Sequence, residues 1–418
     1  MPDYPIPDLE EQLRQDRRLG KARRRRRRMR RLLPILAVLL TAAGIVLLLT
    51  LTGREEETGA SETYAPGSAV ATLNFVGDIS LDEAMLQSFR NGEDYDFTPL
   101  LERVIPKLAS ADLTVGNLEG SISTGSYAAD HSYPPALLRD LYAAGFDVLQ
   151  TANSYSIQNG ITGLVETKQA IQAAGMDAVG TWVSEEDRRE NGVLIREVNG
   201  LRIAFLSFTK GMNNLRLPDG TDYCVNLLYT DYDTNYSKIA RSAISSAVEE
   251  AKLAQPDLIV ALLHWGSEYD KEIADSQKEI AKLLFDSGVN LIVGSHSHYI
   301  GAMELKSRNL AVSGGSFIAY SLGDFVSTAD VSAAHNGCIL SVTVCKDEDG
   351  IRITDLHYAP TYSAYPSAEL SVDSYAVLDT LDAISFYRSG YYDRVSDQLY
   401  EKLTAAVEKM KEQTGLEP

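Results

Sequence analysis

Cysteine is scarce in this chain of 418 residues, which contains only Cys224, Cys338 and Cys345. Three cysteines are too few for the disulfide framework that stabilises many small domains outside the cell. Cys338 and Cys345 fall in one expected strand, where their odd separation directs the two thiols to opposite faces. We therefore expect no bridge between these two residues.

Basic residues are also scarce once the first 31 residues are set aside. Residues 1–31 contain 12 Lys and Arg against 5 Asp and Glu, whereas the rest contains 27 against 53, a net charge of −26. Because so acidic a body repels nucleic acid through its overall field, we expect no nucleic-acid partner. Hydrophobic residues make up 44% of the chain, which excludes global disorder and allows a substantial core.

Charge is absent from residues 32–53, and this segment predicts a transmembrane anchor. As a helix, its 22 residues would span about 33 Å, close to the roughly 30 Å hydrocarbon core of a bilayer. Arginines precede the segment and acidic residues follow it, so the positive-inside rule places residues 1–31 in the cytoplasm and the body outside the cell. The absence of a polar face argues against a buried core helix, and a cleaved signal peptide is the alternative.

The basic run at residues 23–31 lies directly before this anchor. Such a run attracts anionic lipid headgroups by about 1 kcal/mol per basic residue near the surface. Nucleic-acid binding is the competing interpretation of a basic run. Its position beside the apolar segment favours lipid, so we expect the membrane as a partner.

The body is organised as an α/β domain at residues 69–359, joined to the anchor by a polar linker at 54–68. Apolar runs alternate with helical stretches, a pattern typical of buried, largely parallel strands. The expected strands are 70–76, 113–115, 148–149, 203–208, 258–263, 291–293 and 316–321. The expected helices are 98–109, 135–144, 164–174, 236–254 and 275–287.

The alternation of apolar runs and helical stretches ends near residue 336. Residues 337–344 and 351–358 flank Asp349-Gly350, which predicts a hairpin. A Tyr-rich extension follows at 360–418 and is expected to be helical from about 393 to 413. We expect this extension to pack against the domain, with a partner surface as the alternative.

Polar clusters follow nearly every apolar run, and histidines are prominent among them. His296 and His298 come directly after the run at 289–293, and His264 ends the run at 258–263. Residues at i and i+2 of an extended strand point to the same side, so both imidazoles can face one point. The other clusters contain Asp78, Asn117-Leu118-Glu119, Asn153-Ser154-Tyr155 and Asp324.

This set of side chains predicts a divalent metal site at the carboxyl ends of the strands. Neutral imidazoles together with carboxylates suit Zn, Mn or Fe, and one bridging carboxylate would permit two ions. Each residue also has a structural explanation, because Asp78, Asn117 and Asn153 could cap helices, and Glu119 and Asp324 could belong to turns. The occurrence of polar residues at successive strand ends favours the metal site.

Five motifs in these clusters resemble the CapA family of capsule and poly-γ-glutamate synthesis proteins. They are Gly77-Asp78-Ile79, Asn117-Leu118-Glu119-Gly120, His264-Trp265-Gly266-Ser267-Glu268-Tyr269, Gly294-Ser295-His296-Ser297-His298 and Tyr320-Ser321-Leu322-Gly323-Asp324-Phe325. The resemblance covers residues 69–359. It implies a four-layer α/β/β/α sandwich of the calcineurin-like metallophosphoesterase type, here preceded by one transmembrane helix.

The resemblance also implies site residues and partners. It assigns Asp78, Glu119, His264, His296 and His298 to the metal, with Asp324 as an additional candidate where the family commonly has Asn. Several members of the family are anchored in the membrane outside the cell, and they work with polymer synthesis and export machinery. Subunits of an envelope polymer synthase or exporter are therefore expected partners.

One motif departs from the family pattern, which usually reads Asn-Asn-His-x-x-Asp where this chain has Asn153-Ser154-Tyr155-Ser156-Ile157-Gln158. Ser154 is a poor replacement for an Asn ligand. Tyr155, with an ordinary pKa near 10, is a weaker acid at neutral pH than histidine.

Two functions stay open on the sequence alone. The first is a membrane-anchored extracytoplasmic hydrolase of the phosphoesterase type, in which Tyr155 or His264 assists the departing group. The second is a non-catalytic assembly or polymer-handling subunit with an incomplete site.

Overall fold

The computed structural model describes residues 64–418, except 66, 124–130, 328, 330 and 393–394. The expected basic segment (1–31), the anchor (32–53) and all of the linker before residue 64 lie outside the described residues. The chain divides into two units, Met1–Tyr64 and Ala65–Pro418, of which the second contains the folded domain. Within the described part of the chain, no helix combines the length and the apolarity needed to cross a membrane.

The first sheet has a parallel half and an antiparallel half, in the order β18-β17-β16-β1-β4-β7-β8, with the short β15 pairing parallel to the end of β1. Its parallel strands are β1 (Ala69–Ile79), β4 (Leu113–Leu118), β7 (Val148–Gln150), β8 (Asp177–Val179) and β15 (Asp324–Val326). Its antiparallel strands are β16 (Asn336–Asp347), β17 (Gly350–Ala364) and β18 (Ala376–Asp379).

The second sheet has the order β13-β14-β12-β11-β10-β9, with four parallel strands in its centre. These are β10 (Leu201–Thr209), β11 (Leu258–His264), β12 (Leu291–Ser295) and β14 (Phe317–Ala319). The edge strands β9 (Leu194–Val198) and β13 (Met303–Leu305) run antiparallel to their neighbours. The expected parallel strands are thus found, but they are divided between two sheets.

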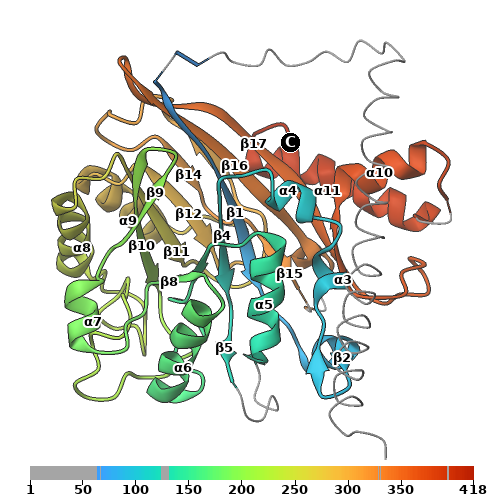
Figure 1. The fold of residues 1–418 in the computed structure, drawn as a ribbon, viewed down its shortest axis with the longest axis horizontal. Coiled ribbons are helices and arrows are strands. Elements are labelled where there is room, and N and C mark those ends of the chain that lie inside the picture. Colours follow the sequence, from blue (N-terminus) through green and yellow to red (C-terminus); the bar gives the residue numbers. More distant parts are fainter. Residues whose placement is uncertain (1–63, 66, 124–130, 328, 330, 393–394) are drawn as a thin grey trace, which may run out of the picture. The chain divides into compact units, whose positions relative to one another are not determined.

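The two sheets pack face to face, and helices cover both outer faces (Figure 1). The core between the sheets joins Leu73 and Phe75 of β1 to Phe205 of β10 and Leu262 of β11. On the outer side of the first sheet lie α2 (Glu83–Ser88), α3 (Thr98–Leu101), α4 (Ile105–Leu108), α5 (Pro135–Ala144) and α6 (Gly160–Ala173). On the outer side of the second sheet lie α8 (Arg241–Leu253) and α9 (Asp275–Ser287).

The remaining elements are short or belong to the carboxyl-terminal part. The short ones are β2 (Arg90–Asn91), β3 (Asp94–Tyr95), β5 (Ser121–Ile122), β6 (Ser132–Tyr133), α7 (Glu185–Glu190) and a 3₁₀ turn at Ser332–His335. The terminal helices α10 (Thr380–Arg388) and α11 (Asp397–Thr414) share a small core with β17 and β18. The segment 360–418 therefore continues the first sheet and covers its antiparallel half.

Local sequence accounts for most helix limits. Helix α5 begins with a proline, whose missing N–H costs nothing there, and ends at Gly145 with a left-handed φ of 108°. The expected helix at 98–109 is instead two short helices, because Pro106 cannot continue the hydrogen bonds of the first. Helix α8 begins at Arg241 rather than 236, since Tyr236 has a left-handed φ of 51°. All three cysteines are buried and free, as predicted for Cys338 and Cys345.

Candidate metal centre

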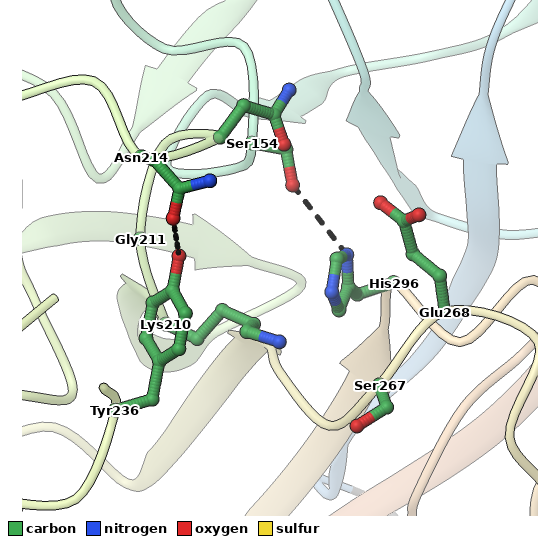
Figure 2. A pocket seen from close by; sticks show the side chains of 9 residues that line it. Ser154, Lys210, Gly211, Asn214, Tyr236, Ser267, Glu268 and His296 are labelled. Atoms are coloured by element: carbon green, nitrogen blue, oxygen red, sulfur yellow. Dashed lines mark hydrogen bonds between the residues drawn. The ribbon is translucent and has the colours of Figure 1, made fainter. Parts of the chain in front are cut away.

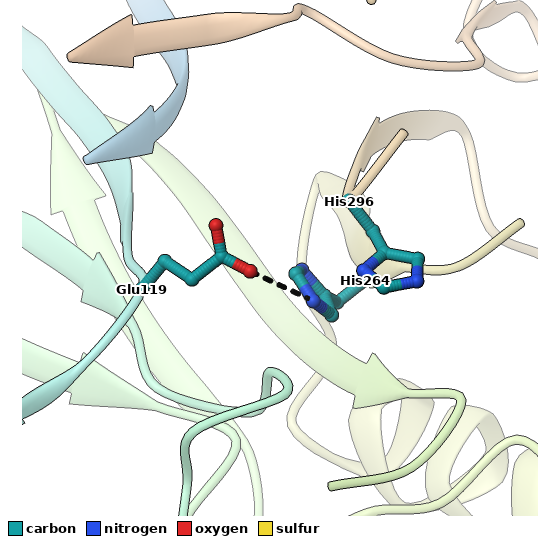
Figure 3. A group of neighbouring side chains, drawn as sticks. All are labelled: Glu119, His264 and His296. Atoms are coloured by element: carbon teal, nitrogen blue, oxygen red, sulfur yellow. Dashed lines mark ion pairs between the residues drawn. The ribbon is translucent and has the colours of Figure 1, made fainter. Parts of the chain in front are cut away.

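The candidate site lies where the ends of strands from both sheets meet. Asp78 and Glu119 come from the ends of β1 and β4, and His264 and His296 from the ends of β11 and β12. Figure 3 shows the Glu119 carboxylate facing His264, with His296 beside it. Residues separated by more than 200 positions in the sequence are thereby brought within contact distance, as the strand-end pattern predicts.

Potential ligand atoms form two groups that share one carboxylate. Glu119, His264 and His296 form the first group, which we term the histidine group. Asp78, Glu119 and His298 form the second, which we term the aspartate group. Within each group the ligand atoms lie within 4.8 Å of one another. A carboxylate common to two groups is the arrangement that permits two neighbouring ions.

The two histidines of the His-x-His motif belong to different groups, which differs from the sequence expectation. Strand β12 ends at Ser295, and both His296 (φ 90°) and His298 (φ 58°) adopt left-handed backbone conformations. Because the backbone is not extended there, the imidazoles do not point at one spot, and their ring centroids lie 6.3 Å apart. Non-glycine residues rarely adopt these angles, and they concentrate at functional sites.

Glu119 carries the clearest sign that a cation fits this site. Its side chain is buried, its Oε1 lies 3.4 Å from His264 Nε2, and its Oε2 has no hydrogen-bond partner. Burial and the neighbouring charge of Asp78 raise the pKa of Glu119 well above its ordinary value. A buried carboxylate oxygen without a partner is costly, and a divalent ion would compensate that cost.

Asp78 is held in place by a network of buried amides. Its Oδ1 accepts a hydrogen bond of 2.5 Å from Asn117 Nδ2, and its Oδ2 accepts one of 2.9 Å from the backbone N–H of His296. Asn153 Nδ2 donates to Asn117 Oδ1 at 3.1 Å and so fixes the orientation of that amide. Burial and the charge of Asp324 raise the pKa of Asp78 to about 6, although His298 and these hydrogen bonds oppose the rise.

The surroundings of His264 and His296 favour the neutral imidazole, which is the form that binds a metal. Burial, followed by the neighbouring imidazoles of His296 and His298, lowers the pKa of His264 well below its ordinary value. Burial and the charge of Lys210 lower the pKa of His296 in the same way. Ser295 Oγ lies 3.1 Å from His264 Nδ1, and by accepting a hydrogen bond from the Nδ1–H it would leave the lone pair of Nε2 facing Glu119.

Asp324 contacts His298 and lies outside both ligand groups. Its Oδ1 is 2.9 Å from His298 Nδ1, an ion pair between two largely buried side chains. Burial lowers the pKa of His298, but the hydrogen bond and charge of Asp324 outweigh it and raise that pKa to about 10. In this structure Asp324 orients a candidate ligand, whereas the sequence placed it among the ligands.

The segment that departs from the family motif occupies the centre of the site. Ser154 Oγ lies 2.9 Å from His264 Nε2 and 3.5 Å from His296 Nδ1, so it stands at the histidine group. The Tyr155 ring instead stacks on His131, with ring centroids 3.7 Å apart. Fully buried His264 belongs to the ligand set, a position that suits coordination better than proton transfer to a departing group.

A cavity of about 320 Å³ opens beside the histidine group. It is lined by Ser154, Lys210, Gly211, Asn213, Asn214, Tyr236, Ser267, Glu268 and His296 (Figure 2). Lys210 and Gly211 were not among the predicted site residues. The sequence does contain a pattern that predicts this position. Thr209-Lys210-Gly211 is a polar cluster directly after the apolar run 203–208, and the other site residues also stand in polar clusters directly after apolar runs.

Comparisons of the sequence with known proteins agree with the five motifs. The sequence model of the family described as Bacterial capsule synthesis protein PGA_cap matches residues 72–329. The chain is 28% identical over 264 residues to the capsule biosynthesis protein CapA of Bacillus anthracis, and the match covers 61% of this chain and 59% of that protein. It is 26% identical over 320 residues to the PGA biosynthesis protein CapA of Bacillus subtilis strain 168, and the match covers 72% of this chain and 76% of that protein.

Two of the similar solved structures are a phosphatase and a phosphoesterase of low sequence identity. A phosphatase from Mycoplasma pneumoniae gives a TM-score of 0.42 at 14% identity, covering 70% of this chain and 93% of that one. The calcineurin-like phosphoesterase YfkN from Bacillus subtilis gives a TM-score of 0.41 at 13% identity, covering 82% of this chain and 97% of that one. Both scores are below 0.5, so the site rests on its own geometry.

Proposed function

The chain belongs to the family of the bacterial capsule synthesis protein PGA_cap, and from this premise we propose that it is a membrane-anchored, extracytoplasmic protein of capsule or poly-γ-glutamate biosynthesis or export. In this proposal the body carries a metal-dependent hydrolase site of the phosphoesterase type. The mixed α/β fold with strand-end ligands from two sheets supports this proposal.

The observation that carries the hydrolase proposal is the carboxylate of Glu119 shared by two ligand groups. One group is rich in imidazole nitrogen and the other in carboxylate oxygen, a donor set that suits Mn, Zn or Fe. Divalent ions bound there would polarise a phosphoryl oxygen and make an activated water available at neutral pH. The buried, partnerless Oε2 of Glu119 supports this assignment independently of the family.

The protein's own residues would keep the ligands in place. Asn117 donates to Asp78, and Asp324 holds the imidazole of His298. Ligands whose second partners are fixed in this way bind metal more tightly than mobile ones. The cavity beside His296 gives a substrate access to the histidine group.

The proposed anchor is the uncharged segment 32–53, with residues 1–31 in the cytoplasm and the body outside. The basic run would contact anionic lipids, and the proposed protein partners are subunits of an envelope polymer synthase or exporter. Protease added outside intact cells tests this topology. Digestion of the body with protection of an amino-terminal tag is the expected result, and protection of both would contradict it.

Metal analysis and hydrolysis by the full-length chain test the hydrolase. We expect one or two Mn, Zn or Fe ions per chain and slow hydrolysis of bis(4-nitrophenyl) phosphate. Both should be lost in His296→Ala and kept in His357→Ala, since His357 is exposed and pairs only with Asp355 in the described structure. A wild-type chain without stoichiometric metal would refute the proposal.

A non-catalytic subunit is the second candidate, and the position of Ser154 and Tyr155 favours it. Ser154 stands against both imidazoles of the histidine group, and Tyr155 is stacked on His131. In this case the wild-type chain binds metal but hydrolyses nothing. The double substitution Ser154→Asn with Tyr155→His, which restores the family motif, should then introduce hydrolysis. Activity in the wild type that the double substitution leaves unchanged would exclude this candidate.

A further inference from the structure

The cavity beside the histidine group contains a cation that the metal centre does not use. Lys210 follows the end of β10, and its backbone N–H donates to the carbonyl of His264 at 2.8 Å. Figure 2 shows its side chain extending into the cavity toward His296. The Nζ donates to the carbonyl of Gly266 at 2.6 Å and lies 4.8 Å from the centroid of the Tyr236 ring. Lys210 is therefore fixed by its surroundings and is not a free surface lysine.

The charge of Lys210 reaches the metal centre. Lys210 and His296 line the same cavity, so the ammonium lies beside the histidine group. Burial lowers the pKa of Lys210, and the carboxylate of Glu268 opposes this effect. A half-buried ammonium beside a metal centre attracts an anion more strongly than one in bulk water, because screening is weaker.

The wall around Lys210 is closely packed at Gly211 and is linked through Tyr236. Asn213, Asn214 and Tyr236 all have left-handed φ values, between 49° and 60°. Tyr236 Oη donates to Asn214 Oδ1 at 3.4 Å, which ties two parts of the wall together. A Cβ at Gly211 would lie 2.6 Å from the carbonyl oxygen of Tyr232, so the backbone is closely packed there. Asparagine adopts left-handed angles readily, so the unusual residue of this wall is Tyr236, and such residues concentrate at functional sites.

The other lining groups are polar: Glu268 contributes a carboxylate that faces Lys210 electrostatically, and the rest supply hydrogen bonds. Asn213, Asn214 and Ser267 provide amides and a hydroxyl, and Tyr236 provides an aromatic face. The cavity volume of about 320 Å³ suits one small substituent, and Ser154 and His296 form the wall toward the metal centre. A substituent bound at Lys210 would therefore lie next to the part of the substrate that reacts at the histidine group.

From this geometry we propose that the Lys210 cavity binds an anionic substituent of the substrate, a carboxylate or a phosphate, next to the bond that is cleaved. This inference rests on the proposed hydrolase, because it names a part of that enzyme's substrate. Lys210 contributes the charge, the asparagine amides donate hydrogen bonds, and the closely packed wall sets the distance to the metal centre.

Titration of the metal-free full-length chain with inorganic phosphate and with glutarate tests the proposal. Isothermal titration calorimetry should detect one site for at least one probe. Lys210→Met should weaken that binding at least fivefold, whereas Lys210→Arg should retain most of it. Tighter binding of phosphate indicates a phosphorylated substituent, and tighter binding of glutarate indicates a carboxylate.

Two further variants separate charge from folding. Asn214→Asp keeps the acceptor for Tyr236 Oη and tolerates the left-handed φ, but it adds a negative charge to the cavity, so binding should weaken. Lys306→Met is the matched control, because Lys306 also lies over an aromatic ring, that of Phe285 at 4.4 Å, but does not line the cavity. It should bind both probes as the wild type does.

Failure of this inference is distinguishable from failure of the proposed function. If neither probe binds, or if Lys210→Met binds both probes as tightly as the wild type, the cavity is not an anion site. Neither result depends on metal, since the protein is titrated without it. The hydrolase would be refuted separately, by the absence of stoichiometric metal in the wild-type chain.

Discussion

Glu119 is the residue on which the candidate metal centre depends most, because its carboxylate belongs to both ligand groups. We expect Glu119→Gln to weaken binding at both groups. Substitution of outer partners alone costs about 10- to 100-fold in affinity, so loss of a shared ligand should exceed about 100-fold. His264→Ala should weaken only the histidine group. Metal content after dialysis against a fixed free-metal concentration measures the difference.

His357→Ala is the control for these two substitutions. His357 lies on β17, pairs with Asp355 and is half exposed, so its loss should leave the metal content unchanged. Retention of full metal content by Glu119→Gln would show that Glu119 is a structural carboxylate rather than a shared ligand.

Metal binding should release protons, because His298 is charged in the metal-free protein. The carboxylates around it, Asp324 above all, outweigh the effect of burial and raise the pKa of His298 to about 10. A metal binds only the neutral imidazole, so affinity should rise with pH, by about tenfold per pH unit for each proton released, until His298 is deprotonated. Below about pH 6, Asp78 also takes up a proton and affinity should fall more steeply.

Calorimetry in buffers of different ionisation enthalpy, such as PIPES and Tris at pH 7, counts the protons released. The apparent binding enthalpy should differ between the two buffers. In Asp324→Asn the difference should shrink, since the amide can no longer hold His298 in its charged form. Equal enthalpies in both buffers for the wild type would contradict the prediction.

At the residue scale, the sequence pattern located the candidate ligands but not the residues that hold them in place. Asp78, Glu119 and the three histidines stand directly after apolar runs, and the strand-end rule locates such residues from local pattern alone. The interaction of Asn153 with Asn117, and of Asp324 with His298, depends on how loops pack across the site. Those contacts join residues from separate strands, and no local pattern specifies them.

At the scale of elements, the close approach of β1 to β15 fixes the position of Asp78. The backbone N–H of Asp78 donates to the carbonyl of Gly323 at 3.1 Å, and a Cβ at Gly77 would collide with that carbonyl. Gly77→Ala should therefore push the two strands apart. We expect a loss of about 1 to 3 kcal/mol in the free energy of unfolding, as for other overpacked sites, together with reduced metal content.

Gly92→Ala is the comparison for this substitution. Gly92 has a φ of 67° and open space around its Cα, so alanine there costs about 1 to 2 kcal/mol of backbone strain but displaces no neighbour. Chemical denaturation should show similar destabilisation in both variants, whereas only Gly77→Ala should lose metal. Full metal content in Gly77→Ala would show that the approach of β1 to β15 does not position Asp78.

Long apolar runs and capped helices were predictable, and short elements were not. Helices α5 and α9 have the limits expected, because a proline or a polar start and a terminal glycine define them. Strands β8, β9 and β13 have three to five residues each, and their apolar character is weak. Their conformation comes from pairing with longer neighbours, which is a tertiary effect.

At the scale of the whole molecule, the division of the strands between two sheets was not derivable from the alternation of strands and helices. The family resemblance implied it, and the core between the sheets explains it. Phe75 and Phe205 occupy facing strands and are both fully buried, so neither sheet alone would cover them. The candidate metal centre lies at one end of this core and takes ligands from both sheets.

Because its ligands come from both sheets, bound metal should stabilise their association. Without metal, the buried carboxyl groups of Asp78, Glu119 and Asp324 lie close together at the junction, which raises the pKa values of Asp78 and Glu119, and His298 compensates this effect only in part. An ion held at 100 times its dissociation constant stabilises the folded state by about 2.7 kcal/mol. Chelation by EDTA should therefore lower the midpoint of thermal unfolding by several degrees, and restored Mn or Zn should raise it again. The same treatment should leave the unfolding midpoint of Glu119→Gln unchanged, since that variant lacks the shared ligand and holds little metal for EDTA to remove. An EDTA-insensitive wild type would mean that the two sheets associate through their apolar core alone, with no contribution from metal.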